Sequence, residues 1–487
     1  MFEQILSDSS LVKTHGYING EWVVSASGNL FDVVNPATGE IIAKVADLGV
    51  VETQKAIVAA HKAMASWAKR TAKEKSAVLR KWFDLVMSNQ EDLAKIMTVE
   101  QGKVLAEARG EVAYGASYIE WFAEESKRIY GDILPNTTTD RRSVVIKQPI
   151  GVVGAITPWN FPIAMITRKV APALAAGCSV VLKPAAETPL SALALVELAE
   201  RAGLPKGMFN VVPGLDAPQI GERLTSHPLV KKVTFTGSTR VGKILMAQSA
   251  QTVKRTSMEL GGNAPVLVFD DADLDKAVQG AFAAKFRNAG QTCICANRIL
   301  VQSSIYDEFV RRFTEKAEQF VLGEGLSEAS TMGPLITRNA VEGVSTLVAD
   351  ALDKGASLTT GGTQPAGEGY FFTPAVIRDL NQSMRLSKEE VFGPVAPIFK
   401  FETEEEAIEM ANDTEFGLAA YLFTKDQSRS WRVSEALEYG MVGVNETAIS
   451  SEMIPFGGVK ESGQGREGSK YGLEDYLEMK YICLGDI

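Results

Sequence analysis

Histidine and cysteine are scarce in this sequence, and their scarcity excludes two classes of site. The chain has 487 residues, of which only three are His and four are Cys. Three His residues are too few for a His-rich metal centre, and none lies in a recognisable Ser-His-Asp triad motif. Four Cys residues do not make a disulfide scaffold at this length. We therefore expect neither a metal site nor a disulfide framework.

Basic runs, leader segments and long apolar stretches are missing as well. Lys and Arg number 50 against 60 Asp and Glu, and a net charge of −10 without a basic run argues against nucleic-acid binding. Residues 1–10 have no apolar core and are too acidic for a mitochondrial presequence, so we expect no leader. Apolar stretches such as 170–182 are shorter than the roughly 18–20 residues that cross a bilayer. These absences predict a soluble, cytoplasmic protein without membrane partners.

The composition is that of a large folded protein. Hydrophobic residues make up 45% of the chain and charged residues 23%, which excludes intrinsic disorder. Between about 144 and 270, runs that are apolar at every position alternate with helix-like segments, as in a parallel sheet covered on both faces. This alternation predicts an open α/β sheet, which binds ligands at the carboxyl ends of its strands. The expected strands are 151–156, 179–182, 208–212 and 232–236.

A second alternation begins at about 262. Strands are expected at 265–269 and 298–301, and a helix at 304–322, so this half is long enough for an α/β domain of its own. Two segments, 127–149 and the tail from about 470, fit neither pattern. We expect these two segments to form an oligomerisation element.

Cys293 and Glu259 lie in motifs suited to chemistry. Cys293 follows Gly-Gln-Thr, small residues that let a substrate approach the sulfur, and a thiolate is the most nucleophilic side chain near neutral pH. A buried structural Cys is the alternative for this motif alone. Glu259 precedes two Gly residues and an apolar strand, where it would serve as a general base with a raised pKa or as an ordinary loop carboxylate.

Two further motifs follow predicted strands. Asn160 comes directly after the strand 151–156, so its amide would donate to a developing oxyanion or cap a proline-shaped turn. At Gly237 and Ser238 a strand turns into a helix, and a helix N-terminus with a hydroxyl-rich entry is an anion site. The segment lacks the G-x-G-x-x-G pattern, so by itself it is a weak dinucleotide signal.

Together and in this order, the four motifs resemble those of the aldehyde dehydrogenase superfamily, and the resemblance runs from Tyr17-Ile-Asn-Gly-Glu-Trp22 to Tyr471–Leu477. It implies an α/β fold with a Rossmann-like cofactor domain, an α/β catalytic domain and a small β oligomerisation element. It also implies a homo-oligomer, either a dimer or a tetramer. The corresponding ranges are 1–126 and 150–258 for the cofactor domain, 259–448 for the catalytic domain, and 127–149 and 470–487 for the oligomerisation element.

The resemblance implies catalytic roles for five residues. Cys293 matches the nucleophile that attacks an aldehyde to give a thiohemiacetal, and Asn160 with the backbone N–H of Cys293 matches the oxyanion hole. Hydride transfer to the nicotinamide then leaves a thioester. Glu259 matches the base that activates the hydrolytic water, and Lys169 and Glu467 match positions that relay protons. No metal is required by this chemistry.

The resemblance also implies a dinucleotide site. Lys183 matches the residue that reaches the adenosine ribose, and Ala186 stands where many NAD-using members have a Glu that accepts from the ribose 2′-OH. Without that carboxylate a 2′-phosphate can pair with Lys183, so we expect NADP to be preferred over NAD, unless Glu187 holds the ribose instead. The implied cofactor residues are Ile156, Thr157, Pro158, Trp159, Lys183, Ala186, Gly237, Ser238, Glu390 and Phe392.

Three further positions resemble the succinate-semialdehyde dehydrogenases of this superfamily. Arg168, Arg287 and Ser450 match residues that clamp a substrate carboxylate, and guanidinium and hydroxyl groups suit that task because their hydrogen bonds are directed. An ordinary surface or interdomain ion pair is the better explanation of each Arg alone, but the three positions together favour the carboxylate site. Cys295 matches a second Cys that forms a disulfide with the nucleophile on oxidation, so we expect a redox switch or, alternatively, a small pocket-lining residue.

The sequence therefore predicts an NAD(P)-dependent enzyme that oxidises succinate semialdehyde to succinate in 4-aminobutyrate degradation. Another ω-carboxylated aldehyde, such as glutarate semialdehyde, is the alternative within the class, because one methylene changes selectivity by only about 1–3 kcal/mol. A Cys esterase without a redox role is the alternative from another class. A binding protein that has lost activity is disfavoured by the joint presence of Cys293, Glu259 and Asn160.

Overall fold

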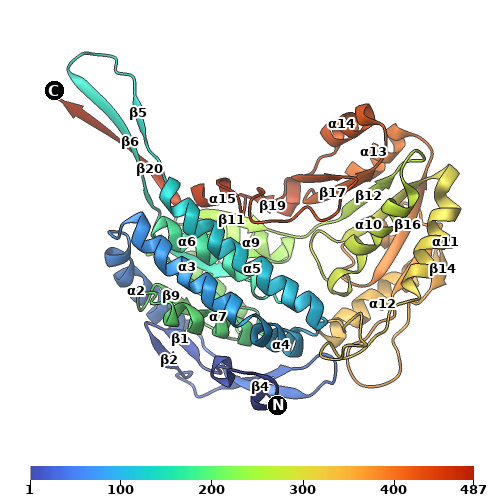
Figure 1. The fold of residues 1–487 in the computed structure, drawn as a ribbon, viewed down its shortest axis with the longest axis horizontal. Coiled ribbons are helices and arrows are strands. Elements are labelled where there is room, and N and C mark those ends of the chain that lie inside the picture. The colour runs from blue at the N-terminus through green and yellow to red at the C-terminus, as the bar shows by residue number, and fades with distance from the viewer. Residues whose placement is uncertain (1, 487) are drawn as a thin grey trace.

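The structure, a computed structural model, describes residues 2–486. Figure 1 shows two α/β units side by side and a narrow β arm that projects from the first of them. The first unit is built on an eight-stranded sheet, the second on a seven-stranded sheet, and the arm is a three-stranded sheet. No helix within residues 2–486 is long and apolar enough to cross a membrane.

The eight-stranded sheet has the order β19-β11-β10-β7-β8-β9-β1-β2. Its five central strands run parallel, and β7, β8 and β9 are buried along nearly their whole length, which explains their unbroken apolar sequence. The strands at both edges are antiparallel. The bounds are β1 (Gly16–Ile18), β2 (Glu21–Val23), β7 (Val152–Ile156), β8 (Ser179–Lys183), β9 (Phe209–Val211), β10 (Val230–Thr236), β11 (Arg255–Glu259) and β19 (Gly463–Gln464).

Helices cover both faces of this sheet. On one face α2, α8 and α9 bury Ile57, Leu224 and Leu245 against the strands. On the other face α6 and α7 lie on the sheet, and α3, α4 and α5 form a further layer over them. The bounds are α2 (Val50–Trp67), α3 (Ala72–Ser88), α4 (Gln90–Gln101), α5 (Leu105–Glu125), α6 (Ala164–Ala176), α7 (Pro189–Arg201), α8 (Ala217–Ser226) and α9 (Thr239–Ala250).

The predicted alternation of strands and helices is confirmed in this unit. The four expected strands are β7, β8, β9 and β10, each within two residues of its predicted bounds. β11 was not expected as a strand, because Arg255-Thr-Ser-Met-Glu259 contains no apolar run. It forms because β10 pairs with it on one side and β19, two hundred residues later in the chain, pairs on the other.

The seven-stranded sheet of the second unit has the order β14-β15-β16-β13-β12-β17-β18, and only β14 is antiparallel to its neighbour. Helices α10 and α11 pack on β13, while α13 packs on β12 and α14 on β18. The bounds are β12 (Ala264–Val268), β13 (Ala296–Gln302), β14 (Ser357–Thr360), β15 (Ala375–Arg378), β16 (Val395–Phe401), β17 (Ala419–Phe423), β18 (Met441–Val444), α10 (Leu274–Phe286), α11 (Tyr306–Ala317), α12 (Arg338–Asp353), α13 (Glu404–Asn412) and α14 (Gln427–Ala436).

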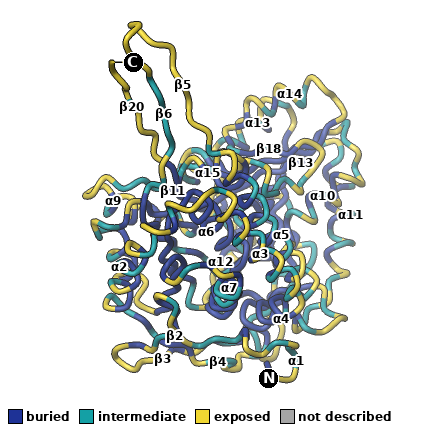
Figure 2. Tube along the Cα trace, turned by 60° about the vertical axis from the view of Figure 1, so that its left-hand side comes forward, coloured by how far each residue is buried: buried dark blue, intermediate teal, exposed yellow. Residues whose placement is uncertain are grey.

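The arm joins segments that lie far apart in the chain. β5 (Asp132–Leu134) and β6 (Arg141–Pro149) form a hairpin, and β20 (Leu477–Gly485) pairs with β6 over its whole length. Figure 2 shows that most of the arm is exposed, and Ile133, at 82%, and Met479, at 76%, are among its exposed apolar side chains. The arm therefore has no apolar layer of its own within one chain.

Short elements complete the fold. They are α1 (Phe2–Ile5), α15 (Tyr471–Glu474), the hairpin β3 (Leu30–Val34) and β4 (Ile41–Ala46), and the 3-10 turns η1 (Ser9–Leu11), η2 (Ser126–Arg128), η3 (Arg287–Gly290), η4 (Ser303–Ile305), η5 (Arg385–Ser387) and η6 (Lys460–Ser462). The helix expected from 304 begins at Tyr306, after the turn η4, and ends at Ala317.

Gly463 makes the pairing of β19 with β11 possible. Its φ is +129°, and a Cβ at this position would lie 1.9 Å from the carbonyl oxygen of Met258. We expect Gly463→Ala to destabilise the protein by about 1–3 kcal/mol or more, because the added methyl group has no space and φ is left-handed. The midpoint of urea denaturation measures this loss. Gly343→Ala is the matched control, since nothing lies within 4 Å of its Cβ position in α12. An unchanged midpoint for Gly463→Ala would contradict the assignment of β19.

Candidate active site

The carboxyl ends of neighbouring parallel strands bring predicted site residues to one edge of the first sheet. Ile156 ends β7, Lys183 ends β8, Thr236 ends β10 and Glu259 ends β11. The pairing register sets Ile156 opposite Lys183 and Thr236 opposite Glu259. The predicted site residues Ile156, Lys183 and Glu259, which lie far apart in the sequence, are therefore brought to one edge, as expected at the carboxyl ends of parallel strands.

A cavity of about 240 Å³ lies at this edge, and we call it the thiol cavity. Both α/β units contribute to its wall, and it contains the predicted nucleophile together with most of the predicted dinucleotide residues. Four predicted cofactor residues, Ile156, Thr157, Lys183 and Ala186, do not line it. The lining residues are Pro158, Trp159, Asn160, Met165, Thr236, Gly237, Ser238, Leu260, Gly261, Cys293, Glu390 and Phe392.

Cys293 follows a tight loop with unusual backbone angles. Asn288, Ala289 and Gly290 all have φ between +52° and +75°, and a Cβ on Gly290 would lie 2.1 Å from the carbonyl oxygen of Gly393. The close packing of Gly393 thus fixes the loop that carries the thiol. Burial raises the pKa of the Cys293 thiol to about 12, so the resting group is the neutral thiol and needs a base to become a nucleophile.

Asn160 is held at both ends. Its side-chain Nδ2 donates to the carbonyl of Gln291 at 3.0 Å, two residues before Cys293. Its own carbonyl accepts from Lys103 Nζ at 2.8 Å and from Asn288 Nδ2 at 3.0 Å. The amide that sequence analysis assigned to an oxyanion hole therefore lies beside the loop that carries the thiol, and its orientation is fixed by three hydrogen bonds.

Behind the thiol cavity lies a buried cluster of two carboxyl groups and two cations. Glu467 forms ion pairs with Lys169 and with Arg168, whose Nε lies 2.8 Å from Glu467 Oε2. The carboxyl group of Glu259 has no hydrogen-bond partner among residues 2–486. The side chains of Arg168, Lys169 and Glu467 are at most 3% exposed, so their charges interact with little screening by water.

The pKa values of the two carboxyl groups are pushed in opposite directions. Burial, reinforced by the charge of Glu467, raises the pKa of Glu259 well above its usual range. Although burial opposes it, the neighbouring Lys169 and Arg168 hold the pKa of Glu467 below its usual range. The two buried carboxyl groups therefore differ in acidity, with Glu259 the weaker acid and Glu467 the stronger.

A second cavity, of about 310 Å³, is lined by Phe161, the residue after Asn160, and we call it the anion cavity. The Arg287 guanidinium in its wall stacks on the Phe161 ring, 4.8 Å from the centroid, and forms no ion pair within residues 2–486. Ser450 Oγ lies in the same wall and is hydrogen-bonded to Tyr114. The lining residues are Lys103, Glu107, Gly110, Glu111, Tyr114, Phe161, Arg287, Asn288 and Ser450.

The structure brings together two of the three predicted carboxylate-binding residues, Arg287 and Ser450. Arg168 lines neither cavity. It is 1% exposed, pairs with Glu467, and lies over the rings of Phe456 and Tyr118 at 3.9 and 5.6 Å. In this conformation its positive charge belongs to the buried carboxyl cluster.

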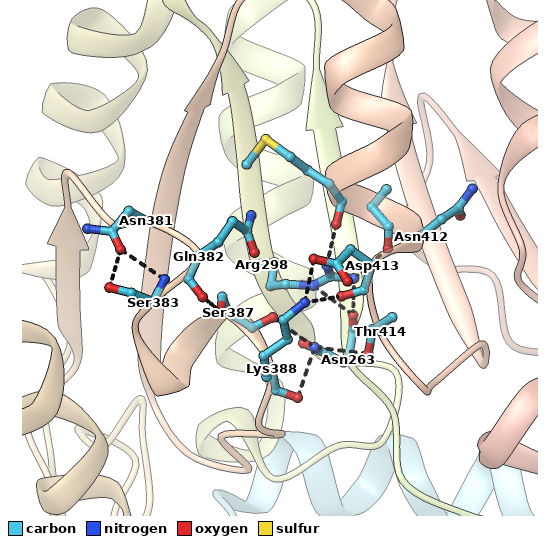
Figure 3. Close-up of polar contacts among 12 residues, drawn as sticks. Asn263, Arg298, Asn381, Gln382, Ser383, Ser387, Lys388, Asn412, Asp413 and Thr414 are labelled. Atoms are coloured by element: carbon cyan, nitrogen blue, oxygen red, sulfur yellow. Dashed lines mark hydrogen bonds and ion pairs between the residues drawn. The ribbon is translucent and has the colours of Figure 1, made fainter.

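Hydrogen bonds hold Glu390 and the segment that precedes it. Its Oε1 accepts from the backbone N–H of Gly262 at 3.1 Å, and burial raises its pKa to about 8. Figure 3 shows how Asn263 connects the segment before Glu390 to the second sheet. Asn263 Nδ2 donates to the carbonyls of Ser387 and Lys388, and Arg298 Nη2 donates to the carbonyl of Asn263 at 3.0 Å. Phe392 in turn meets the Trp159 ring edge-on at 5.5 Å.

The remaining predicted residues occupy separate places. Lys183 Nζ donates to the Pro184 carbonyl at 3.1 Å, and burial lowers its pKa. Ala186 is half-buried, and Ser238 is exposed at the N-terminus of α9. Cys295 is buried, and its thiol donates to the carbonyl of Lys285 at 3.2 Å; both it and Cys293 are free thiols in this structure.

Sequence analysis missed three charged residues of the anion cavity: Lys103, Glu107 and Glu111. They occur at a spacing of four residues, which places them on one face as the chain enters α5. The side chains of Lys103 and Glu111 are each 1% exposed and form an ion pair, and Glu107 accepts from the Asn288 N–H at 2.9 Å. Charges repeated at this spacing beside an apolar helix face are the signal that would have found them.

The high pKa of Cys293 predicts how its alkylation depends on pH. Below the pKa the thiolate fraction grows about tenfold with each pH unit, so the rate should rise without a plateau between about pH 6 and 9. Iodoacetamide labelling of the ligand-free protein, followed by mass spectrometry of the Cys293 peptide, measures this rate. The exposed Cys483 reports reagent quality in the same digest. A plateau below about pH 8 would contradict a thiol whose pKa is raised by burial.

Comparison with known proteins places the whole chain among enzymes that act on aldehydes. The sequence model described as the Aldehyde dehydrogenase family matches residues 22–482. A 3-sulfolactaldehyde dehydrogenase of Pseudomonas putida is 58% identical over 482 residues, covering 99% of each chain. The succinate-semialdehyde dehydrogenase (NADP(+)) of Escherichia coli is 57% identical over 480 residues, again covering 99% of each.

Two further similarities extend this picture. A glutarate-semialdehyde dehydrogenase of Pseudomonas aeruginosa is 57% identical over 482 residues, covering 99% of this chain and 100% of the relative. The crystal structure of a succinate-semialdehyde dehydrogenase from Burkholderia pseudomallei superimposes with a TM-score of 0.97 at 57% identity, covering 99% of both chains.

Proposed function

The chain belongs to the aldehyde dehydrogenase family, and we propose that it oxidises succinate semialdehyde to succinate with NADP, using Cys293 as the nucleophile. The observation that carries the substrate class is the Arg287 guanidinium, which lines the anion cavity without an ion-pair partner among residues 2–486. Arg287 is exposed in the cavity wall, so its guanidinium is free to form directed, charge-assisted hydrogen bonds to a substrate carboxylate. Ser450 in the same wall adds a hydroxyl donor.

The relatives' names support an anionic substrate. 3-Sulfolactaldehyde, succinate semialdehyde and glutarate semialdehyde each have an aldehyde at one end and an acidic group at the other. The two cavities suit such a molecule, because Asn160 lines the thiol cavity and the next residue, Phe161, lines the anion cavity. The charge of Arg287 also acts on the Cys293 thiol, which indicates that an aldehyde at Cys293 and a carboxylate at Arg287 can belong to one small molecule.

Two features of the thiol cavity fit a dinucleotide. The N-terminus of α9 opens into it at Ser238, and backbone N–H groups at a helix N-terminus bind phosphate. The buried hydroxyl of Thr236 has no hydrogen-bond partner among residues 2–486, so it is available to a polar ligand. Glu390, Phe392 and Trp159 would hold the nicotinamide end. When bound, the nicotinamide supplies the hydride acceptor for the oxidation.

The chain's own residues perform the acyl chemistry. Cys293, once deprotonated, attacks the aldehyde carbon, and Asn160 Nδ2 with the Cys293 N–H stabilises the negative charge that forms on the oxygen. After oxidation the acyl group is a thioester on Cys293. Glu259, in its deprotonated form, takes a proton from the water that attacks the thioester. The products are a carboxylate and the free thiol, so Cys293 is regenerated.

Several parts of this proposal rest on sequence and family membership. Glutarate semialdehyde is the alternative substrate, and ester hydrolysis is the alternative activity at the same thiol. The exposed apolar side chains of the arm, such as Ile133 and Met479, support its use in a homo-oligomer of two or four chains. The domain ranges, the cytoplasmic location, the place in 4-aminobutyrate degradation and the disulfide between Cys293 and Cys295 stay predictions.

Substituting Arg287 tests the substrate class. With succinate semialdehyde we expect Arg287→Ala to lower kcat/KM by about 10–150-fold, the effect of losing hydrogen bonds to a charged group. Butanal has the same number of carbons and no carboxylate, so its kcat/KM should stay unchanged. Steady-state rates of NADPH formation measure both. Arg311→Ala is the matched control, because Arg311 is an exposed Arg on α11 that pairs with Glu308 and Glu315.

Arg168 needs a separate comparison. If it binds the carboxylate, as the sequence predicts, Arg168→Ala lowers kcat/KM more for succinate semialdehyde than for butanal. If Arg168 acts only through its ion pair with Glu467, kcat/KM falls by the same factor for both aldehydes. Equal rates with the two aldehydes in the unmodified enzyme would overturn the proposed substrate class itself.

Ala186→Glu tests the cofactor. The new carboxylate would repel a 2′-phosphate and accept from a 2′-hydroxyl, so kcat/KM should fall for NADP and rise for NAD, each by about tenfold or more. Glu187→Gln is the control, since an effect there instead would assign the ribose contact to Glu187. A preference for NAD in the unmodified enzyme would contradict the proposal.

A further inference from the structure

Lys103 is a buried cation that the mechanism above does not use. It lies between α4 and α5, and its side chain is 1% exposed. Its ammonium group forms an ion pair with Glu111, donates to the carbonyl of Asn160 at 2.8 Å, and lies 4.0 Å from the centroid of the Phe161 ring. We infer that Lys103 is a positioning residue for the oxyanion hole, acting through Asn160.

The partner of Lys103 holds the other side of the same segment. Glu111 Oε1 accepts from the backbone N–H groups of Ile163 and Ala164, at 2.9 and 3.3 Å, where α6 begins. The Lys103–Glu111 pair therefore fixes residues 160–164 from both ends, by a hydrogen bond to the carbonyl of Asn160 and two from the helix N-terminus. A carboxylate at a helix N-terminus is itself stabilised there.

Asn160 is thus held at two points, and the residues that hold it are bound by the same loop. Its carbonyl is bound by Lys103 and its side-chain amide is bound by the carbonyl of Gln291. The loop 323–336 holds both of these residues. Gly325 accepts from the Leu105 N–H at 2.9 Å, beside Lys103, and Gln291 is bound by the Pro334 carbonyl and the Ile336 N–H. The position of the amide relative to the Cys293 loop is therefore set by residues outside the reacting atoms.

This inference rests on the role proposed for Asn160, so the two must be tested separately. Removing the amide in Asn160→Ala should lower the single-turnover rate of NADPH formation by about 10²–10³-fold. If that rate is unchanged, Asn160 is not an oxyanion donor, and the proposed chemistry fails before the question of Lys103 arises.

The decisive experiment is a double-mutant cycle between Lys103 and Asn160. Lys103→Met keeps the chain length and removes the donor, and a displaced donor of this kind lowers the rate by about 10²-fold. In the Asn160→Ala background the same change should lower the rate by no more than about twofold, because there is no amide left to position. If the rate loss in the double variant equals the product of the two single losses, Lys103 acts independently of Asn160, and the inference is overturned.

A second measurement distinguishes a loss of Asn160 positioning from a general distortion of the Cys293 loop. Alkylation of Cys293 by iodoacetamide forms no oxyanion, so Lys103→Met should leave its rate unchanged while single turnover slows. Slowing of both would indicate a distorted loop and would contradict the inference. Lys232→Met is the matched control, since Lys232 is equally buried and bound to Ser257 but lies at the other end of β10 from the cavity. We expect the Lys232→Met variant to be less stable and to have an unchanged single-turnover rate.

Lys103→Arg keeps the test available if Lys103→Met does not fold. The guanidinium retains the charge and can reach both Glu111 and the Asn160 carbonyl, but its greater length moves that carbonyl. We expect an intermediate loss of rate in single turnover, and no further loss in the Asn160→Ala background. A full loss that persists in that background would overturn the inference just as clearly.

Discussion

The cost of keeping charge away from water is the constraint on which this active site depends. Cys293, Glu259 and Glu390 all have their pKa raised by burial, so each is neutral until something nearby favours its charged form. Where the charged form persists, the structure supplies a partner, as Lys169 does for Glu467 and Glu111 does for Lys103. Burial therefore divides the site into groups whose pKa it raises and charged groups that are held in ion pairs.

Arg287 departs from this pattern, because it is an exposed cation that forms no ion pair within residues 2–486. Lys103, Arg168 and Lys169 each form an ion pair with a buried carboxylate, whereas Arg287 contacts the face of Phe161. Glu107 lines the same cavity, but burial raises its pKa and its Oε1 accepts from the backbone of Asn288. An anionic ligand thus completes an electrostatic arrangement that the folded chain leaves open.

Local sequence determined much of this architecture, and long-range packing determined the rest. The apolar runs from 151 to 236 predicted β7 to β10 because strands buried on both faces need no polar alternation. β11 could not be predicted from its own residues, because it forms by pairing with β10 and with β19, which lies far along the chain. The motifs identified Cys293 and Asn160, yet Lys103 could not be recognised as their support. Its significance depends on a contact between segments that are 57 residues apart.

Phe161 connects the two halves of the proposed reaction. One ring receives two cations, Lys103 at 4.0 Å from its centroid and Arg287 at 4.8 Å. The residue before it is Asn160, whose amide faces the Cys293 loop. A carboxylate bound by Arg287 would draw that guanidinium toward itself and weaken its attraction to the ring, while Lys103 keeps both the ring and the Asn160 carbonyl in place. The proposed binding of the acidic end and the proposed orientation of the oxyanion donor therefore depend on one segment, which Lys103 holds at the Asn160 carbonyl and the Phe161 ring.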